Sequence, residues 1–138
     1  IPLGIVAPGV TRAGGVTRQL AETVDLYPTL AELAGLPAPQ GPQPIDGLSL
    51  VPVLRDPAKT IRDHAHHCFP RGERMGRAIR TERHRLVEWK KPRAARETAE
   101  LELYDYETDP LETRNLAAEQ PEVVAALRAI LDRHPEAR

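Results

Sequence analysis

Three side chains that can bind a metal alternate within one short segment of the sequence. His64, His66 and Cys68 occupy every second position, so they would project from one face of a strand. Imidazole and thiolate groups are ligands that zinc accepts. The sequence offers no second cluster of such residues that could complete a tetrahedral site. We therefore expect these residues to pack or to form a polar rim, and we predict no metal site in this chain.

Arg71 is the arginine best placed to bind an anion. It stands between Pro70 and Gly72, at the end of an expected strand. Binding residues gather in loops at strand ends, and a locally basic surface attracts anionic ligands. We therefore predict that Arg71 and its neighbours His66 and His67 contact an anionic substrate.

Two other conspicuous residues have structural roles in our interpretation. Arg80 lies in an expected strand, and Asp105 and Asp109 lie in the element expected to face it. We predict a structural ion pair between Arg80 and one of these acids rather than a substrate contact. Trp89 is the only tryptophan of the chain, and we expect it in the core or covering a sheet rather than serving as a platform for a sugar.

The net charge of −1 conceals a strong asymmetry along the chain. Residues 1–56 carry three basic and five acidic side chains, residues 57–97 carry twelve and five, and residues 98–138 carry four and ten. We expect the basic middle and the acidic tail to neutralise each other across a sheet. The acidic tail and the scarcity of aromatic residues argue against a nucleic-acid partner, and the apolar runs are too short to span a membrane.

The first half of the sequence alternates short elements with loops. The apolar run from Ile1 to Ala7 predicts a buried strand. A helix is predicted from Asp25 as its N-cap to Gly35 as its C-terminal stop, with Pro28 in the first turn. A proline-rich connection over 36–47 then precedes a short helix over 48–54.

The second half predicts antiparallel strands covered by one helix. Strands are expected over 64–69, 75–81, 84–89 and 101–104, with a tight turn near Glu82 and Arg83. Pro121 begins a last helix, whose apolar stripe contains Val123, Leu127, Ile130 and Leu131. Strands in sequence followed by a covering helix indicate an α+β arrangement.

Several segments occur in a characteristic order and spacing. They are Val24 to Leu30, Ala34 to Pro37, Asp46 to Leu50, Phe69 to Arg71, Met75 to Trp89, Glu102 to Asp105, Asp109 to Glu112, and Asn115 with Leu116. Together they resemble the C-terminal portion of formylglycine-dependent (type I) sulfatases of the alkaline phosphatase superfamily. Phe69 to Arg71, followed by Met75 to Trp89, is most similar to the iduronate-2-sulfatase-like branch.

This resemblance implies a function for a longer parent protein. Such a parent hydrolyses sulfate esters of a sugar or another anionic substrate, using formylglycine as the nucleophile and a divalent metal, usually calcium, to neutralise charge on the sulfate. The resemblance also implies that the catalytic residues and metal ligands come from the remainder of the sulfatase catalytic domain. It further implies a periplasmic, secreted or lysosome-like compartment. We expect the isolated chain to be inactive.

One segment imitates the family's nucleophile motif without matching it. The motif that becomes formylglycine is Cys or Ser, any residue, Pro, any residue, Arg. Here Cys68 and Pro70 have the right separation, but Gly72 stands where the arginine belongs. We therefore interpret Cys68 as a residue without a catalytic role.

The expected organisation has two parts. Residues 1–56 are predicted to be the end of an alkaline-phosphatase-like α/β domain, and residues 57–138 a C-terminal subdomain with a small antiparallel sheet of about four strands and a terminal helix. The isolated chain is expected to associate with itself through the unpaired strand over 1–7, or to have disordered N-terminal residues. Two alternatives remain open: a phosphonate or phosphate monoesterase of the same superfamily, and a stand-alone binding or oligomerisation module.

Overall fold

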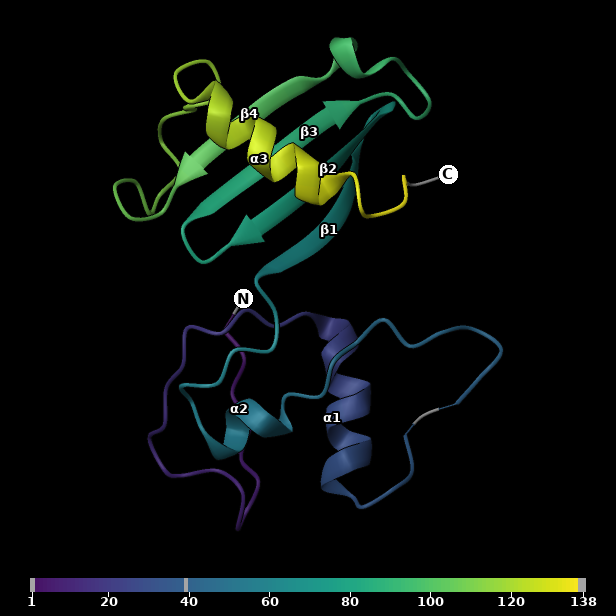
Figure 1. Cartoon of the computed structure of the whole chain (residues 1–138), viewed down its shortest axis with the longest axis vertical. Coiled ribbons are helices and arrows are strands. Elements are labelled where there is room, and N and C mark those ends of the chain that lie inside the picture. Colours follow the sequence, from purple (N-terminus) through teal and green to yellow (C-terminus); the bar gives the residue numbers. More distant parts are fainter. Residues whose placement is uncertain (1, 39, 137–138) are drawn as a thin grey trace. The chain divides into compact units, whose positions relative to one another are not determined.

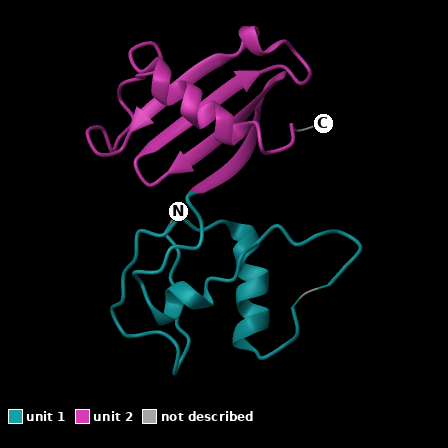
Figure 2. Ribbon diagram, in the orientation of Figure 1, with its two compact units in different colours: residues 1–63 teal, residues 64–138 magenta. Residues whose placement is uncertain are grey.

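The computed structural model describes residues 2–38 and 40–136, and they form two compact units. Unit 1 ends at Asp63 and unit 2 begins at His64 (Figure 2). The boundary expected from the sequence, at residue 56, lies before this point. Residues 57–63 belong to unit 1 because Thr17 donates a hydrogen bond to the carbonyl of Pro57 at 2.8 Å, and Gln19 donates to the carbonyl of Arg62 at 3.0 Å.

Unit 1 contains a 3₁₀ turn and two short helices. The turn η1 spans Thr23–Asp25, α1 spans Leu26–Leu33 and α2 spans Val51–Arg55. The helix predicted from Asp25 to Gly35 is therefore confirmed, and Gly35 ends it with a positive φ of 67°. Glycine adopts this left-handed conformation without the steric cost that other residues incur.

The side chain of Asp25 joins two segments instead of capping the helix. It is fully buried, and its carboxylate accepts hydrogen bonds of 2.8 Å from the backbone N–H groups of Glu22 and Leu48. It also pairs with Arg62. The predicted N-cap position is correct, but no cap hydrogen bond forms, because the carboxylate is engaged by η1 and by the segment that leads to α2.

The strand predicted over 1–7 is not formed in the described residues. Residues 2–7 have no regular secondary structure, and Leu3 and Val6 are 50% and 90% exposed. A strand needs a neighbour for its backbone hydrogen bonds, and no described segment pairs with these residues. Ile1 lies outside the described residues. The apolar pattern alone therefore gave a wrong assignment.

Unit 2 is a four-stranded antiparallel sheet in sequential order (Figure 1). Its strands are β1 (His64–Arg71), β2 (Arg74–Thr81), β3 (His84–Lys90) and β4 (Glu100–Asp105), with the 3₁₀ turn η2 (Arg96–Thr98) before β4. The turn at Glu82 and Arg83 is where the sequence predicts it, since Arg80 pairs with Arg85 across the hairpin. The α+β fold predicted from the sequence is confirmed.

Helix α3 (Pro121–Leu131) lies across one face of this sheet (Figure 1). The core between them contains Ile79, Leu86, Leu103, Leu116, Val124, Leu127 and Leu131. Val123 and Ile130, expected in the apolar stripe, pack only partly against this core. None of the helices in the described ranges is long and apolar enough to cross a membrane.

Strand alternation assigns the remaining side chains to the opposite face, which we call the open face. Because Ile79, Leu86 and Leu103 face α3, their strand neighbours point the other way. The register places Gly76 beside Trp89 and Trp89 beside Glu100. The open face therefore carries charged and aromatic residues from all four strands.

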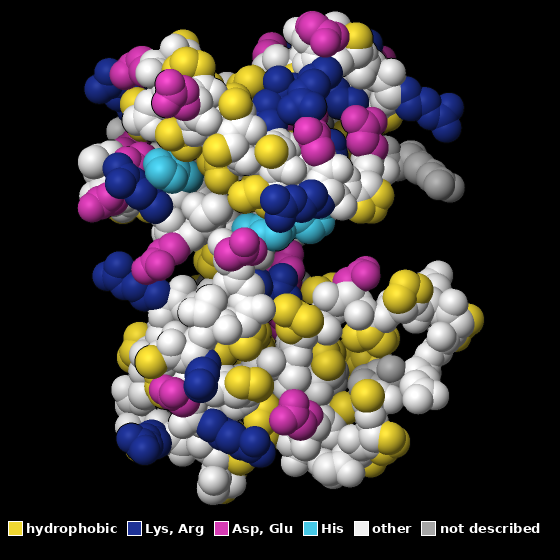
Figure 3. All heavy atoms as spheres, viewed as in Figure 1, with side chains coloured by type: hydrophobic (Ala, Val, Ile, Leu, Met, Phe, Trp, Pro, Cys, Tyr) yellow, Lys and Arg dark blue, Asp and Glu magenta, His cyan; other side chains and the backbone are white. Residues whose placement is uncertain are grey.

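Ion pairs between the basic and acidic segments of unit 2 confirm the expected neutralisation. They join Arg74 to Glu100, Arg83 to Asp105, Arg85 to Glu112, Lys90 to Glu136 and Arg96 to Asp132. Basic and acidic side chains accordingly lie side by side on the surface of this unit seen in Figure 3. The basic stretch of the sequence is thus largely compensated within its own fold.

Candidate functional site

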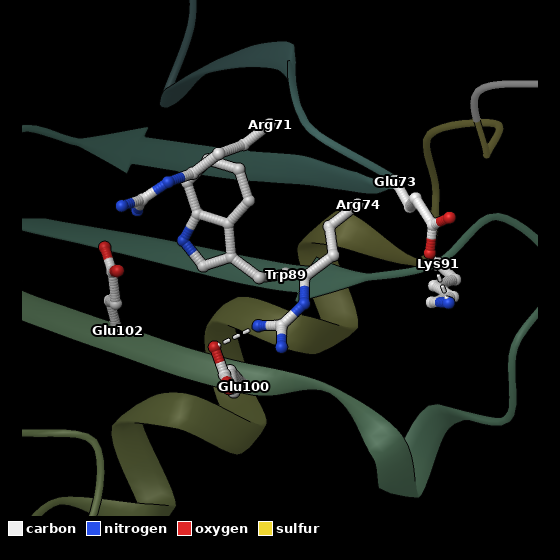
Figure 4. A pocket seen from close by; sticks show the side chains of 7 residues that line it. All are labelled: Arg71, Glu73, Arg74, Trp89, Lys91, Glu100 and Glu102. Atoms are coloured by element: carbon white, nitrogen blue, oxygen red, sulfur yellow. Dashed lines mark hydrogen bonds and ion pairs between the residues drawn. The ribbon is translucent and has the colours of Figure 1, made fainter.

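A cavity of about 510 Å³ lies on the open face of the sheet, near the end where β1 turns into β2. Its lining comes from the ends of all four strands and the segments next to them. The lining residues are Arg71, Glu73, Arg74, Trp89, Lys91, Glu100 and Glu102 (Figure 4). It thus combines three cations, three carboxylates and one indole ring.

The indole ring of Trp89 forms the floor of this cavity. A Cβ atom at Gly76 would lie only 2.5 Å from the ring, so only glycine lets the ring lie this close to the backbone of β2. The expectation that Trp89 covers the sheet is correct at this position. Its buried Nε1–H has no hydrogen-bond partner among the described residues, and such donors are normally satisfied.

Two of the three cations in the lining are paired with carboxylates of the lining itself. Arg74 forms an ion pair with Glu100, and Lys91 Nζ lies 2.5 Å from Glu73 (Figure 4). Arg71 differs, because within the described ranges its side chain has no ion pair and no hydrogen bond. Its guanidinium carbon lies 5.8 Å from the centre of the Trp89 ring. Arg71 therefore remains available for an anionic ligand.

The structure separates His66 from Arg71. His66 lies on the face of β1 that points toward α3, where its ring stacks on His134 with centroids 4.2 Å apart. Burial, the nearby His134 and the cationic Arg77 lower the pKa of His66 to about 4. His66 is therefore neutral, stacked and on the opposite face of the sheet from Arg71. His67 does lie on the open face with Arg71, four positions earlier in β1.

The alternating residues His64, His66 and Cys68 do project from one face. Cys68 Sγ lies 3.7 Å from His66 Nε2, and His64 Nε2 lies 2.8 Å from His134 Nε2. Burial raises the pKa of the Cys68 thiol, although Arg77 opposes this effect. In the part of the chain that the structure describes, no group of three or more His, Cys, Asp or Glu residues is arranged to hold a metal ion.

The ion pair predicted for Arg80 is formed by Arg83 instead. Arg83 binds Asp105 through two hydrogen bonds, Nε to Oδ1 at 3.0 Å and Nη2 to Oδ2 at 2.7 Å. Asp105 shares the α3 side of the sheet with Leu103, whereas Arg80 points to the open face. There Arg80 lies over the ring of Tyr106, 3.6 Å from its centre. The prediction failed because it ignored the alternation of β4.

Asp109, the second acid predicted to pair with Arg80, stabilises its own turn. Its carboxylate accepts hydrogen bonds from the Thr113 hydroxyl at 3.2 Å and from the Arg114 backbone N–H at 2.8 Å. The hydrogen bond from Arg114 is the main cause that lowers the pKa of Asp109. The carboxylate therefore has a local structural role.

Sequence reasoning missed most of the cavity. Arg74, Lys91, Glu100 and Glu102 were not singled out, although the hairpin turn and strand alternation together place them on the face that carries Trp89. The register of three strands would have indicated that these residues share one face, but this register can be assigned only when all the turns between the strands have been located.

Nearly the whole chain matches a protein family model. The model of the family described as "N-sulphoglucosamine sulphohydrolase, C-terminal" covers residues 1–136. A sulfatase of Formosa agariphila is 36% identical over 130 residues, which are 88% of this chain and 23% of that protein. Arylsulfatase A of Homo sapiens is 32% identical over 139 residues, covering 86% of this chain and 27% of that protein.

Solved structures show the same relationship. The structure of BT4656 in complex with its substrate D-glucosamine-2-N,6-O-disulfate matches with a TM-score of 0.74 and 27% identity, over 91% of this chain and 26% of that one. The phosphonate monoester hydrolase of Agrobacterium radiobacter matches with a TM-score of 0.54 and 25% identity, over 82% of this chain and 26% of that one. The chain thus spans about a quarter of the length of these relatives. The resemblance to the C-terminal portion of sulfatases is confirmed. The chain belongs to the family of sulfatase C-terminal domains described as "N-sulphoglucosamine sulphohydrolase, C-terminal".

Proposed function

We propose that the longer protein containing this chain is a sulfatase that hydrolyses the sulfate ester of a sugar or another anionic molecule. The observation that carries this proposal is the family match over residues 1–136. The similarity to a structure with a bound glucosamine disulfate favours a sulfated sugar as the substrate. In this proposal the chain supplies a structural subdomain and one part of the rim of the substrate cleft.

Sulfatases generally use formylglycine as a nucleophile and calcium to neutralise the sulfate oxygens. The described residues of this chain do not fit either group. Cys68 has Gly72 where the formylglycine motif requires arginine, and no cluster of metal ligands occurs in the described ranges. We therefore infer that both groups are held by other parts of the longer protein, and that the chain alone does not catalyse hydrolysis.

Arg71 is the residue of this chain that we assign to the cleft rim. Its guanidinium is unpaired within the described ranges, it ends β1, and it borders a cavity. A sulfate group would accept charge-assisted hydrogen bonds from two of its nitrogen atoms. His67 lies on the same face and stays a candidate neighbour, whereas the stacked and neutral His66 fits this role poorly.

The test compares the longer protein with the isolated chain. Both are produced together with a formylglycine-generating enzyme and supplied with calcium, and the release of inorganic sulfate from an aryl sulfate and from glucosamine 6-sulfate is measured. We expect release by the longer protein and none by the isolated chain. Release by the isolated chain that is abolished in Cys68→Ala would contradict the proposal. Faster hydrolysis of a phosphonate monoester than of either sulfate would favour the rival enzyme class, and no hydrolysis at all would favour a non-enzymatic module.

The role of Arg71 is tested in the same longer protein. We expect Arg71→Ala to raise KM for a sulfated oligosaccharide about tenfold, because charge-assisted hydrogen bonds to an anionic group of the substrate are lost. Arg133→Ala is the matched control, since Arg133 is exposed and lies outside the cavity. Equal KM values for both variants would show that Arg71 does not contact the substrate.

A further inference from the structure

The cavity on the open face is lined by a flat aromatic ring, over which the Arg71 guanidinium lies 5.8 Å from the ring centre. One face of the Trp89 ring rests on Gly76, and the ring lines the cavity. The side chain is neither fully buried nor fully exposed. Because Gly76 removes the Cβ atom that would tilt the ring away from the sheet, the indole is held in one orientation before any ligand arrives.

Three polar groups lie around this ring. Within the described ranges Trp89 Nε1–H has no acceptor, neither Arg71 nor Glu102 forms an ion pair, and Glu102 shares a side-chain hydrogen bond with Tyr104. Figure 4 shows the Arg71 guanidinium and the Glu102 carboxylate on the side of the ring that carries Nε1. The cavity therefore presents a ring surface, a cation and an acceptor, while the indole N–H is buried and lacks an acceptor among the described residues.

The other charged residues of the lining fix the shape of the cavity. Arg74 is held by Glu100, and Lys91 by Glu73. The first pair reaches from β2 across β3 to β4, and the second joins the turn after β1 to the segment after β3, so both reduce the freedom of long side chains that would otherwise fill the cavity. They leave one cation, Arg71, and one carboxylate, Glu102, without an ion pair in the described part of the chain, which limits the negative charge that a ligand can carry here.

This combination selects a chemical class of ligand. A sugar ring has an apolar face for the indole, hydroxyl groups that donate to Glu102, and an anionic substituent for Arg71. A nucleic acid or polyphosphate fits poorly, because Glu73, Glu100 and Glu102 would repel a dense row of phosphates. An apolar ligand would leave the charges unsatisfied.

We propose that the cavity around Trp89 is a subsite for one sugar ring bearing an anionic group, and that the substrate is therefore an acidic oligosaccharide. The inference rests on the proposed sulfatase function for the identity of the reaction. It adds that a ring other than the one that loses its sulfate is bound through Trp89, Glu102 and Arg71. Under this proposal, the chain makes the longer protein bind an oligosaccharide more tightly than a monosaccharide.

The experiment measures how substrate length changes the effect of a Trp89 substitution in the longer protein. The probes are a tetrasaccharide of alternating glucosamine 6-sulfate and glucuronate, and the monosaccharide glucosamine 6-sulfate. We expect Trp89→Ala to raise KM for the tetrasaccharide about tenfold more than for the monosaccharide. Trp89→Phe retains part of the ring surface, and we expect a differential of about threefold.

Binding without turnover supplies a second readout. The longer protein, prepared without conversion of its nucleophile, is titrated with the tetrasaccharide by calorimetry. Trp89→Ala, Trp89→Phe and Glu102→Gln should each raise the dissociation constant measured by calorimetry and the KM measured by kinetics. If Trp89→Ala does not fold, Trp89→Phe and Glu102→Gln carry the test. Arg133→Ala is again the control.

Two results would overturn this inference. One is an equal effect of each substitution on both probes, and the other is no effect on either. Hydrolysis of the monosaccharide by the unmodified protein tests the sulfatase proposal separately. A protein that hydrolyses the monosaccharide but shows no length-dependent effect would therefore refute the subsite and leave the proposed function standing.

Discussion

Replacing Glu88 by alanine should destabilise unit 2 more than any surface substitution, because Glu88 is an acid buried between two arginines. It is 3% exposed, and its Oε2 accepts hydrogen bonds from Nε and Nη2 of Arg128 at 2.9 and 2.5 Å. On its other side, Arg77 Nη1 lies 3.7 Å from Oε1. The carboxylate thus connects β2, β3 and α3.

The magnitude of this effect follows from the charge that would be left behind. Arg77 is 4% exposed and keeps only its hydrogen bonds to the backbone carbonyls of Leu131 and His134, at 2.9 and 2.8 Å, together with a distant contact of 3.8 Å to Glu136. Removing one member of a buried pair costs roughly 3–5 kcal/mol, because the remaining charge stays desolvated. This is a large part of a typical free energy of unfolding of about 5–15 kcal/mol.

The assay is a urea titration followed by tryptophan fluorescence. Trp89 is the only tryptophan and lies in β3, so the signal reports on unit 2. With a slope of about 1.5 kcal/mol per molar urea, a loss of about 3 kcal/mol lowers the midpoint by about 2 M. Glu82→Ala is the matched control, because Glu82 is an exposed acid in the turn next to the same strand.

A double-mutant cycle separates pairing from packing. If the ion pair carries the effect, Glu88→Ala and Arg128→Ala should together cost less than the sum of the single losses, by roughly 1–3 kcal/mol. Our reasoning fails if Glu88→Ala and Glu82→Ala shift the midpoint equally, or if the two single losses are simply additive.

Two further predictions concern the sheet. Arg83→Ala should destabilise unit 2 more than Arg80→Ala in a urea titration at pH 7, because the two hydrogen bonds from Arg83 are the main cause that lowers the pKa of Asp105. A lowered folded-state pKa of Asp105 stabilises the fold above the unfolded pKa of about 4, and this contribution is lost as the pH falls through the folded value. The difference between the two variants should therefore shrink steadily as the pH falls below about 4, and a difference that does not change with pH would contradict the assignment. Gly76→Ala should cost about 1–3 kcal/mol and shift the fluorescence maximum of Trp89, because the new Cβ would lie 2.5 Å from the ring; an unchanged spectrum and midpoint would show that the ring does not rest on Gly76.

The elements of unit 2 could be predicted because each has a local cause. The alternating strands, the turn at Glu82 and Arg83, and the apolar stripe that begins after Pro121 are all visible within short windows. The segment over 2–7 has the same kind of apolar pattern and yet forms no strand. Its outcome depends on a partner strand, and a window of seven residues contains no information about that partner.

The candidate site could not be predicted because it depends on the register of the strands and on the absence of a Cβ atom at Gly76. Arg71 was identified from its place at a strand end, but His66 was grouped with it although adjacent residues such as His66 and His67 point to opposite faces of a strand. The cavity needs three strands in one register and a glycine opposite Trp89. The absence of a Cβ at residue 76 acquires meaning only when the ring that occupies its place is known.

The two faces of the sheet divide stability from binding. On the α3 face, buried charges such as Glu88 and Arg77 are engaged by protein groups, so a substitution there changes the free energy of unfolding. On the open face, Arg71 and the Trp89 N–H are unsatisfied within the described residues, so a substitution of Arg71 removes no ion pair or hydrogen bond that holds the fold. Because successive residues of β3 alternate between these faces, Glu88 and Trp89 are neighbours in sequence with separate consequences. If Arg71 and Glu102 bind the substrate as we propose, substrate preference can change at these residues while the buried network that maintains the fold stays intact.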